Sequence, residues 1–381
     1  MNPLTSFLRS RSAAGLPVFD LTESNPTQCG FDYGGEKLLD AFLDPRAMRY
    51  EPDPRGLASA RAAVVQYYAG QGVDIDPSQV FLTSSTSEAY SFIFRLLGNP
   101  GEEVLIPRPS YPLFEFLAGL NDLRLAPYPL AYDAAWRLDQ DALREAATRR
   151  AKAVLVVHPN NPTGSYASAE EAAFLDAFCE EREMALIADE VFFDYAHPRV
   201  PALRAPTFAG EQRSLTFTLN GLSKISGLPQ MKCAWIVASG PAKLLDEALG
   251  RLELIADTFL SLSTPVACAL PQLLEVRRRI QPQILDRVTE NLRLLDSMLV
   301  PESPVSRLNI EGGWCAILRV PRIYSDEEWA LKLLREDGVF LHPGHFYDFP
   351  SDGRLVISLL PQPEVFGEAC NRLLVRAAKG A

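Results

Sequence analysis

The sequence predicts an α/β protein with a large domain of three layers, α-β-α, around a mainly parallel sheet, followed by a smaller α+β domain. From about residue 56, short segments of continuous apolar residues alternate with segments of helical periodicity. Strands that are apolar throughout are typical of a parallel sheet covered by helices on both faces. After Pro271 this alternation stops, and a long helical segment followed by short strands indicates the second unit.

The first unit is expected to contain helices at 57–69 and 86–97, and the segment 98–101 (GNPG) supplies the stop signal for the second of them. A further helix is expected from Pro112. Another opens at Ser168, where Glu171 three residues later completes a capping box. The apolar segments between and after these helices are 104–107, 123–130, 153–158, 185–189, 215–220 and 234–239.

The second unit begins with a helical segment at 272–299, in which Pro282 is expected to cause a break or kink. The strands expected after it are GGWCAILRV, GVFLHPG and RLVISLL. We therefore divide the chain into an N-terminal arm (1–45) that packs on the small domain, a large domain (46–270) and a small C-terminal domain (271–381).

The charge balance argues against a nucleic-acid partner. The chain has 37 Lys and Arg against 48 Asp and Glu, a net charge of −11, and an acidic surface repels phosphate backbones. No apolar run approaches the ~20 residues of a membrane helix. Arg9 and Arg11 interrupt the region where a signal peptide would keep its apolar stretch. We therefore expect a cytoplasmic protein without membrane contact.

Metal and disulfide chemistry are not indicated either. The six cysteines are scattered without a C-x-x-C pair, and in a chain of this length they are typical of core thiols. None of the four histidines falls in a metal-binding spacing.

Lys224 is the first candidate for chemistry, because it directly follows a predicted strand and precedes a loop rich in Gly and Pro. A lysine at the end of a buried strand loses solvation, which lowers its pKa and makes the amine nucleophilic. Taken alone, it is more typical of a surface loop.

Two further motifs follow strands of the same predicted sheet. Asn161 lies in HPNNPTG and Asp189 in ADEVF, both at carboxyl ends of strands, where open α/β sheets bind ligands. The amide could bind a ring oxygen, and a desolvated carboxylate would need a cationic partner. Each motif also has an ordinary structural interpretation, as a turn and as a helix cap.

Hydroxyl groups crowd the entry to the helix at 86–97. Ser84, Ser85, Thr86 and Ser87 are consecutive, whereas a helix cap needs only one hydroxyl. With the free N–H groups of a helix N-terminus they predict an anion site suited to phosphate. Tyr111 follows the strand at 104–107, where its ring could stack on a planar ligand or simply pack in the core.

These parts together suit one ligand with a phosphate, a pyridinium and an aldehyde. In order and separation, HPNNPTG, ADEVF and GLSK with a second lysine eight residues on resemble the class I/II aminotransferases, which are fold type I enzymes dependent on pyridoxal 5′-phosphate. LTESNPTQCGF, YPLF and RLVISLL most resemble the branch acting on alanine and other neutral amino acids.

The resemblance implies a role for each matching residue. Lys224 would be the catalytic lysine that joins the cofactor's aldehyde, Asp189 the partner of the ring nitrogen, Asn161 the group holding the ring oxygen, and Tyr111 the stacking ring. The expected phosphate site comprises Ser85, Thr86, Ser87 and Lys232.

The substrate and the partner subunit also have expected residues. The resemblance implies that Tyr50 reaches the phosphate of a neighbouring subunit, hence a homodimer. Arg354 would bind the substrate carboxylate with its guanidinium, and Asn161 and Ser24 would line the same place.

Four residues depart from the family pattern. Phe192 replaces a tyrosine that donates to the ring oxygen, a hydroxyl that Tyr195 could supply instead. Lys232 replaces an arginine, Gly221 a phosphate-binding serine, and Ser24 a glycine. None of these changes removes a catalytic group.

The expected activity is a ping-pong exchange of an amino group between an L-amino acid and a 2-oxo acid. The alternatives on the same fold are β-elimination and racemisation, and a more distant one is a non-catalytic module that binds the cofactor. An apolar substrate pocket is expected from the aromatic residues Phe19, Phe31, Phe114 and Phe259.

Overall fold

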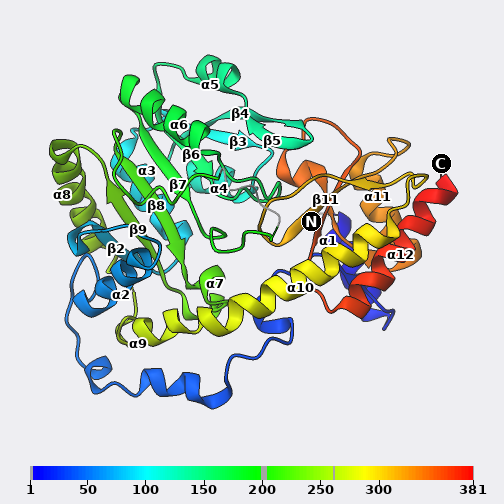
Figure 1. The fold of residues 1–381 in the computed structure, drawn as a ribbon, viewed down its shortest axis with the longest axis horizontal. Coiled ribbons are helices and arrows are strands. Elements are labelled where there is room, and N and C mark those ends of the chain that lie inside the picture. The colour runs from blue at the N-terminus through cyan, green and yellow to red at the C-terminus, as the bar shows by residue number, and fades with distance from the viewer. Residues whose placement is uncertain (1–2, 199–203, 261, 381) are drawn as a thin grey trace.

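The fold is described from a computed structural model, which covers residues 3–198, 204–260 and 262–380. Figure 1 shows a central twisted sheet with helices packed around it, and the long helix α10 running from it toward the C-terminal elements. The N-terminal helix α1 lies among those C-terminal elements, so the two ends of the chain belong to the same part of the molecule.

The described residues form a sheet of eight strands in the order β2-β9-β8-β7-β6-β3-β4-β5. The five strands β8, β7, β6, β3 and β4 are mutually parallel, whereas β2, β9 and β5 join through antiparallel pairs. This confirms the prediction of a mainly parallel sheet. Its strands span Val80–Thr83 (β2), Glu103–Arg108 (β3), Arg124–Asp133 (β4), Ala135–Leu138 (β5), Ala151–Val157 (β6), Ala185–Asp189 (β7), Thr216–Gly221 (β8) and Ala234–Ser239 (β9).

Helices cover both faces of this sheet, as the three-layer prediction requires. Alternate residues of β6 face opposite sides: Leu155 packs in the core under α3, α4 and α8, and Val154 in the core under α5 and α6. At the β2–β9 end, Trp235 packs under α2 and α9. These helices span Ala58–Ala69 (α2), Thr86–Leu97 (α3), Leu113–Leu120 (α4), Gln140–Ala146 (α5), Ala169–Glu181 (α6), Ala242–Phe259 (α8) and Thr264–Glu275 (α9), with a single turn at Leu222–Ile225 (α7).

The C-terminal part has its own antiparallel sheet in the order β10-β11-β14-β13 and its own core. The first strand of the chain, β1, pairs in parallel with β12. The elements here are Pro3–Ala13 (α1), Phe19–Asp20 (β1), Arg277–Met298 (α10), Ser306–Arg307 (β10), Cys315–Arg319 (β11), Asp326–Lys332 (α11), a π-helical turn at Leu333–Asp337, Val339–Phe340 (β12), His342–Pro343 (β13), Arg354–Ser358 (β14) and Pro363–Gly380 (α12).

Short 3₁₀ helices connect several of these elements, at Pro26–Gln28, Gly35–Phe42, Pro45–Met48, Pro77–Gln79, Pro229–Met231 and Gly344–Tyr347. In the N-terminal arm, Phe31 packs against the C-terminal core, whereas Ala41 and Phe42 pack with α2 and α9. The division of the chain at residues 45 and 270 stays a prediction.

The expected helix break at Pro282 is wrong. The helical segment is interrupted at Val276, between α9 and α10, and α10 continues through Pro282. Pro282 lies in the second turn of α10, where its missing N–H removes a single backbone bond and the rest of the helix packs against the C-terminal core. At the interruption, Arg277 donates from Nη1 to the carbonyl of Leu274.

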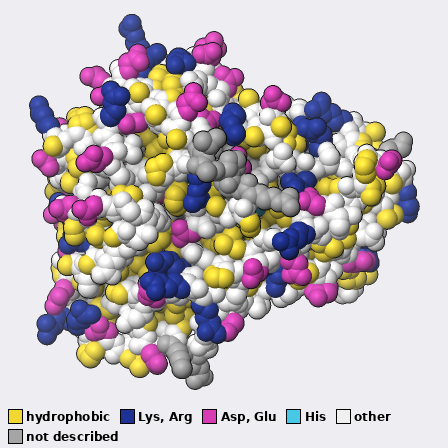
Figure 2. All heavy atoms as spheres, in the orientation of Figure 1, with side chains coloured by type: hydrophobic (Ala, Val, Ile, Leu, Met, Phe, Trp, Pro, Cys, Tyr) yellow, Lys and Arg dark blue, Asp and Glu magenta, His cyan; other side chains and the backbone are white. Residues whose placement is uncertain are grey.

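The surface carries charges of both signs. Figure 2 shows Lys and Arg side chains interspersed with Asp and Glu on the viewed face. Within the described ranges no single helix is both long and apolar enough to cross a membrane. The pair α8 and α9 passes that test only jointly, across a bend of 120°.

The amide of Asn291 ties α10 to the segment that follows β14, and its loss should destabilise the fold. Asn291 is fully buried, and its Nδ2 donates to the carbonyls of Leu359 at 2.9 Å and Pro361 at 2.8 Å. Asn291→Ala should lower the free energy of unfolding by about 2 kcal/mol, because two buried carbonyls lose their donor. Urea titration should show this as a lower midpoint. The exposed neighbour Glu290, changed to Ala, is the control, and an equal midpoint for both variants would contradict the prediction.

Candidate active site

A cavity of about 460 Å³ opens where the carboxyl ends of β6, β7 and β8 face the C-terminal sheet. Parallel strands present their following loops at this edge, which is where open α/β sheets bind ligands. Nine residues predicted from the sequence line it: Ser24, Ser85, Thr86, Ser87, Tyr111, Asn161, Asp189, Lys224 and Lys232.

Lys224 lies in the turn α7 directly after β8, with its amine among aromatic rings. Its Nζ is 4.7 Å from the ring centre of Trp314 and 5.2 Å from that of Phe192. Desolvation lowers the pKa of this amine to about 8, against weaker upward effects of Cys315 and Asp189. The amine is therefore far more often neutral, and nucleophilic, near pH 7 than an ordinary lysine.

Asp189 ends β7 and is buried, with 8% of its surface exposed. It accepts hydrogen bonds from the hydroxyl of Tyr90 at 2.7 Å and from the backbone N–H of Val191 at 3.1 Å. Desolvation raises the pKa of this carboxyl, while the two hydrogen bonds and the charge of Lys224 oppose the rise. Within the described chain no cation bonds to it directly, so the site is suited to a ligand that brings a cationic N–H.

The hydroxyl cluster lies at the N-terminus of α3. Ser85 is the helix cap, and its Oγ accepts a bond from the N–H of Glu88 at 3.2 Å. Thr86 and Ser87 form the first turn, whose free N–H groups and dipole favour an anion. Pairing of β2 with β9 brings this end of α3 close to Lys232, which is exposed. The cluster therefore has the composition of a phosphate site.

Asn161 and Tyr111 line the same cavity. Asn161 follows β6, and its Oδ1 is buried without a hydrogen-bond partner in the described structure. Tyr111 is 43% exposed, and its ring stands edge-on to Phe114 at 6.3 Å between ring centres. An unpaired buried amide oxygen is costly, so Asn161 fits the hypothesis of a polar ligand in the cavity.

Arg354 does not lie with the other predicted residues. Its side chain is half-buried outside the cavity lining, and its Nη1 donates to the carbonyl of Gly353 at 2.9 Å. Two positions along the same strand, and hence on the same face, Val356 lines the cavity instead. The assignment of Arg354 to the substrate carboxylate is therefore corrected. Arg354 is the first residue of β14, two residues before Val356, which is the position on the same face that lines the cavity.

Tyr50 also lies outside the cavity of its own chain, as a residue directed at a second subunit would. Its side chain is 72% exposed and borders a separate small hollow together with Leu260 and Leu262.

One of the four departures from the family pattern, Gly221, now has a physical explanation. A Cβ on Gly221 would lie 2.8 Å from the Cβ of Ala234 on β9, so this position admits no serine. The hydroxyl of Tyr195 donates to the backbone carbonyl of Lys224 at 2.6 Å, and this bond positions the lysine. Tyr195 is not in the cavity lining, whereas Phe192 is, so Tyr195 does not replace the missing donor.

The expected aromatic pocket is mostly wrong. Phe114 lines the cavity. Phe19 and Phe31 instead pack beneath the guanidinium groups of Arg372 and Arg287, and Phe259 packs against Phe92. Composition alone does not say which aromatic side chains share a cavity.

Sequence reasoning missed several cavity residues, namely Tyr90, Trp314, Cys315, His342, Tyr347 and Ser358. Tyr90 had a usable signal, because it lies four residues after Thr86 and so shares its helix face. His342 and Tyr347 had none, because their position depends on the pairing of β13 with β14.

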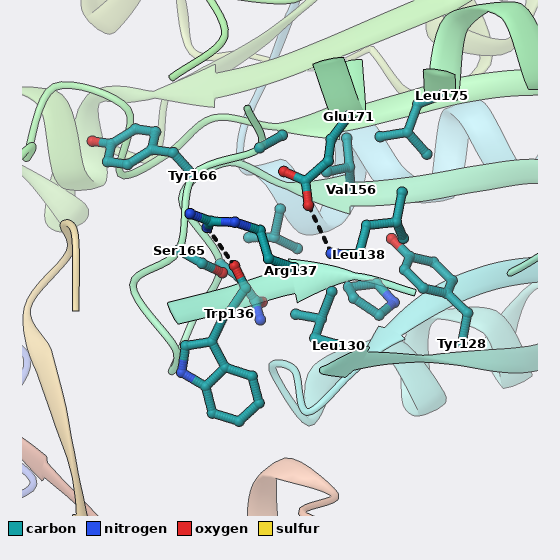
Figure 3. A pocket seen from close by; sticks show the side chains of 14 residues that line it. Tyr128, Leu130, Trp136, Arg137, Leu138, Val156, Ser165, Tyr166, Glu171 and Leu175 are labelled. Carbon is teal, nitrogen blue, oxygen red and sulfur yellow. Dashed lines mark hydrogen bonds between the residues drawn. The ribbon is translucent and has the colours of Figure 1, made fainter. Parts of the chain in front are cut away.

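A second hollow lies beneath β5, between Trp136 and Tyr166 (Figure 3). Glu171 closes it by accepting a bond from the N–H of Leu138 at 2.7 Å. Its volume of about 30 Å³ has room for little more than a water molecule. The larger cavity is therefore the candidate active site.

Comparison with known proteins agrees with this geometry. The family model described as aminotransferase class I and II matches residues 19–373. Glutamate-pyruvate aminotransferase AlaA of Haemophilus influenzae is 28% identical over 372 residues, covering 94% of this chain and 90% of the relative. Alanine aminotransferase of Mycobacterium tuberculosis is 27% identical over 370 residues, covering 95% of this chain and 86% of the relative.

Solved structures show the same fold. Alanine aminotransferase from Pyrococcus furiosus superposes with a TM-score of 0.88 at 24% identity, covering 99% of this chain and 96% of the other. Aspartate aminotransferase of Thermus thermophilus, as a single mutant, gives a TM-score of 0.85 at 21% identity, covering 98% and 97%. The chain belongs to the class I and II aminotransferase family.

Proposed function

We propose that the cavity binds pyridoxal 5′-phosphate and that the enzyme uses it to exchange an amino group between an L-amino acid and a 2-oxo acid in a ping-pong cycle. The observation that carries this proposal is the presence, in one cavity, of a desolvated lysine, a desolvated carboxylate and a helix N-terminus rich in hydroxyls (Lys224, Asp189 and Ser85–Ser87).

The residues present fit the cofactor. Lys224 would join its aldehyde and Asp189 would hold its ring nitrogen. Asn161 would hold the ring oxygen, and Tyr111 would cover the ring. Ser85, Thr86, Ser87 and Lys232 would bind the phosphate. When bound, the cofactor supplies an electron-accepting ring that stabilises the negative charge left when the α-proton of the amino acid departs.

The remaining chemistry belongs to the chain. An amine with a pKa near 8 is a competent base once the substrate has displaced it, so Lys224 would carry the α-proton of the amino acid to its acceptor carbon. Asp189, anchored by Tyr90, would keep the ring nitrogen protonated. The aromatic rings of Trp314 and Phe192 exclude water from the amine.

We further propose a homodimer in which Tyr50 of one subunit completes the phosphate site of the other. Large apolar side chains are exposed along the segment that leads to Tyr50: Leu43 is 75% exposed and Met48 92%. In Figure 1 this segment (blue) runs along the lower edge beneath α9, and Leu260 at the end of α8 borders Tyr50. Exposed apolar side chains gathered in this way are typical of protein interfaces. The cytoplasmic location also stays a prediction.

Replacing the lysine tests the assigned chemistry. Lys224→Ala should lower kcat by at least about 1000-fold, because both the nucleophile and the base are lost. Lys243→Ala, on the exposed side of α8, is the matched control and should keep full activity. Alanine with a 2-oxo acid acceptor is the first substrate pair to assay. The visible absorbance of the bound cofactor reports its state during the reaction. Release of pyruvate and ammonia from a cysteine conjugate, which carries a leaving group on Cβ, without a 2-oxo acid acceptor would instead indicate an eliminase.

Cofactor uptake by the cofactor-free protein should depend on pH through Lys224. Only the neutral amine attacks an aldehyde, and a pKa of about 8 leaves roughly a tenth of it neutral at pH 7. The uptake rate should therefore rise about tenfold per unit below pH 8 and level off above it. Stopped-flow absorbance measures this rate. A rate still rising at pH 10 would show that the amine is an ordinary one.

Mixing two impaired variants, at a cofactor concentration too low to load Tyr50→Ala, tests the shared site. Tyr50→Ala should weaken cofactor binding, and Lys224→Ala should abolish turnover. If Tyr50 acts across the interface, a heterodimer of the two has one intact site, and subunit exchange should restore about a quarter of wild-type activity. Activity that stays at the level of the separate variants would contradict the shared site, and a monomer in sedimentation would contradict the dimer itself.

A further inference from the structure

Among the residues that the structure describes, no guanidinium lines the end of the cavity formed by the C-terminal sheet. Arg354 points elsewhere, and Val356 occupies the place on β14 that faces the cavity. Among the described residues that line the cavity, the lysines are Lys224 and Lys232, and both are assigned to the cofactor above. An amino acid nevertheless brings a carboxylate, which must find a partner when it leaves water.

His342 lies where a side chain could bind the substrate carboxylate. It pairs directly with Val356 across the β13–β14 ladder, and both residues line the cavity. Its Nδ1 lies 3.1 Å from the hydroxyl of Tyr347, a buried residue that also lines the cavity. Because this contact engages one ring nitrogen and fixes the ring, Nε2 is left for a ligand.

We propose that His342, oriented by Tyr347, binds the carboxylate of the amino acid substrate as an imidazolium. The inference rests on the proposed function, since it assigns the substrate end of the same cavity. The imidazole takes up one proton from solvent as the carboxylate enters, so that the pair in the cavity is neutral overall. Leu21, Phe114 and Val356 are apolar residues that line the same cavity, and they favour a neutral side chain on the substrate.

The electrostatic surroundings agree with proton uptake on binding. Desolvation lowers the pKa of His342, and the nearby carboxylate of Asp20 opposes this only in part. A substrate carboxylate against the ring would raise that pKa. The other titratable groups that act on Tyr347 are Cys315 of β11 and Tyr111. Asp326 and Arg354 belong to α11 and β14, the elements that pack against β13.

The test measures steady-state kinetics and cofactor uptake in His342→Gln, which cannot become a cation. KM for the amino acid should rise about 10- to 100-fold, as expected for loss of a charge-assisted bond, while kcat changes little and cofactor uptake is unchanged. KM of the wild type should also rise with pH above the range in which the imidazole protonates, and His342→Gln should lose that dependence. Tyr347→Phe should give a smaller rise in KM, because the ring is only less well held.

His345→Gln is the matched control, since His345 is exposed nearby on the same segment and is absent from the cavity lining. A merely structural role for His342 would reduce stability or cofactor uptake and leave the pH dependence of KM intact. An unchanged KM in His342→Gln would overturn the proposal and leave transamination standing. Failure of the wild type to exchange amino groups with any amino acid would overturn the proposed function instead.

Discussion

The active site of this enzyme depends on two desolvated groups of opposite charge, the carboxylate of Asp189 and the amine of Lys224, that do not pair directly with each other. Asp189 and Lys224 end neighbouring parallel strands, and desolvation raises the pKa of the first and lowers the pKa of the second. No direct ion pair joins them within the part of the chain that the structure describes. Each group is therefore destabilised in its charged form. A ligand that offers a cationic nitrogen to one and an aldehyde to the other relieves both penalties.

The fold maintains this separation through backbone geometry. Strands β6, β7 and β8 end at the same edge, so Asn161, Asp189 and Lys224 follow one another across the sheet. Two tyrosine hydroxyls fix these residues. Tyr90 donates a hydrogen bond to the carboxylate of Asp189, and Tyr195 donates one to the backbone carbonyl of Lys224. Gly221 allows β8 to approach β9 at the start of the lysine turn. Small changes in these supports would alter two pKa values at once.

The sequence allowed the large sheet, its helices and the cofactor end of the site to be predicted, because apolar segments and short motifs are local signals. Asp189 and Lys224 could be placed since each immediately follows a strand. The substrate end could not be predicted in this way. Whether Arg354 or Val356 faces the cavity depends on where β14 begins, and the position of His342 depends on its register with that strand. The interruption of the helix at Val276 was also missed, because the sequence carries no proline or glycine there, whereas α10 continues through Pro282.

Pairing between the two ends of the chain has a consequence for its synthesis. The N–H of Ser358 donates to the carbonyl of Leu21, and its hydroxyl donates to that of Glu23, so one wall of the cavity joins residues more than three hundred positions apart in sequence. On the ribosome, the large sheet can assemble as its strands emerge, but this wall cannot form until β14 has left the exit tunnel. Until then Lys224 stays open to water on that side, and the nascent chain cannot hold its lysine in the desolvated state. The amine of Lys224 therefore becomes nucleophilic only late in synthesis, after β14 has been made.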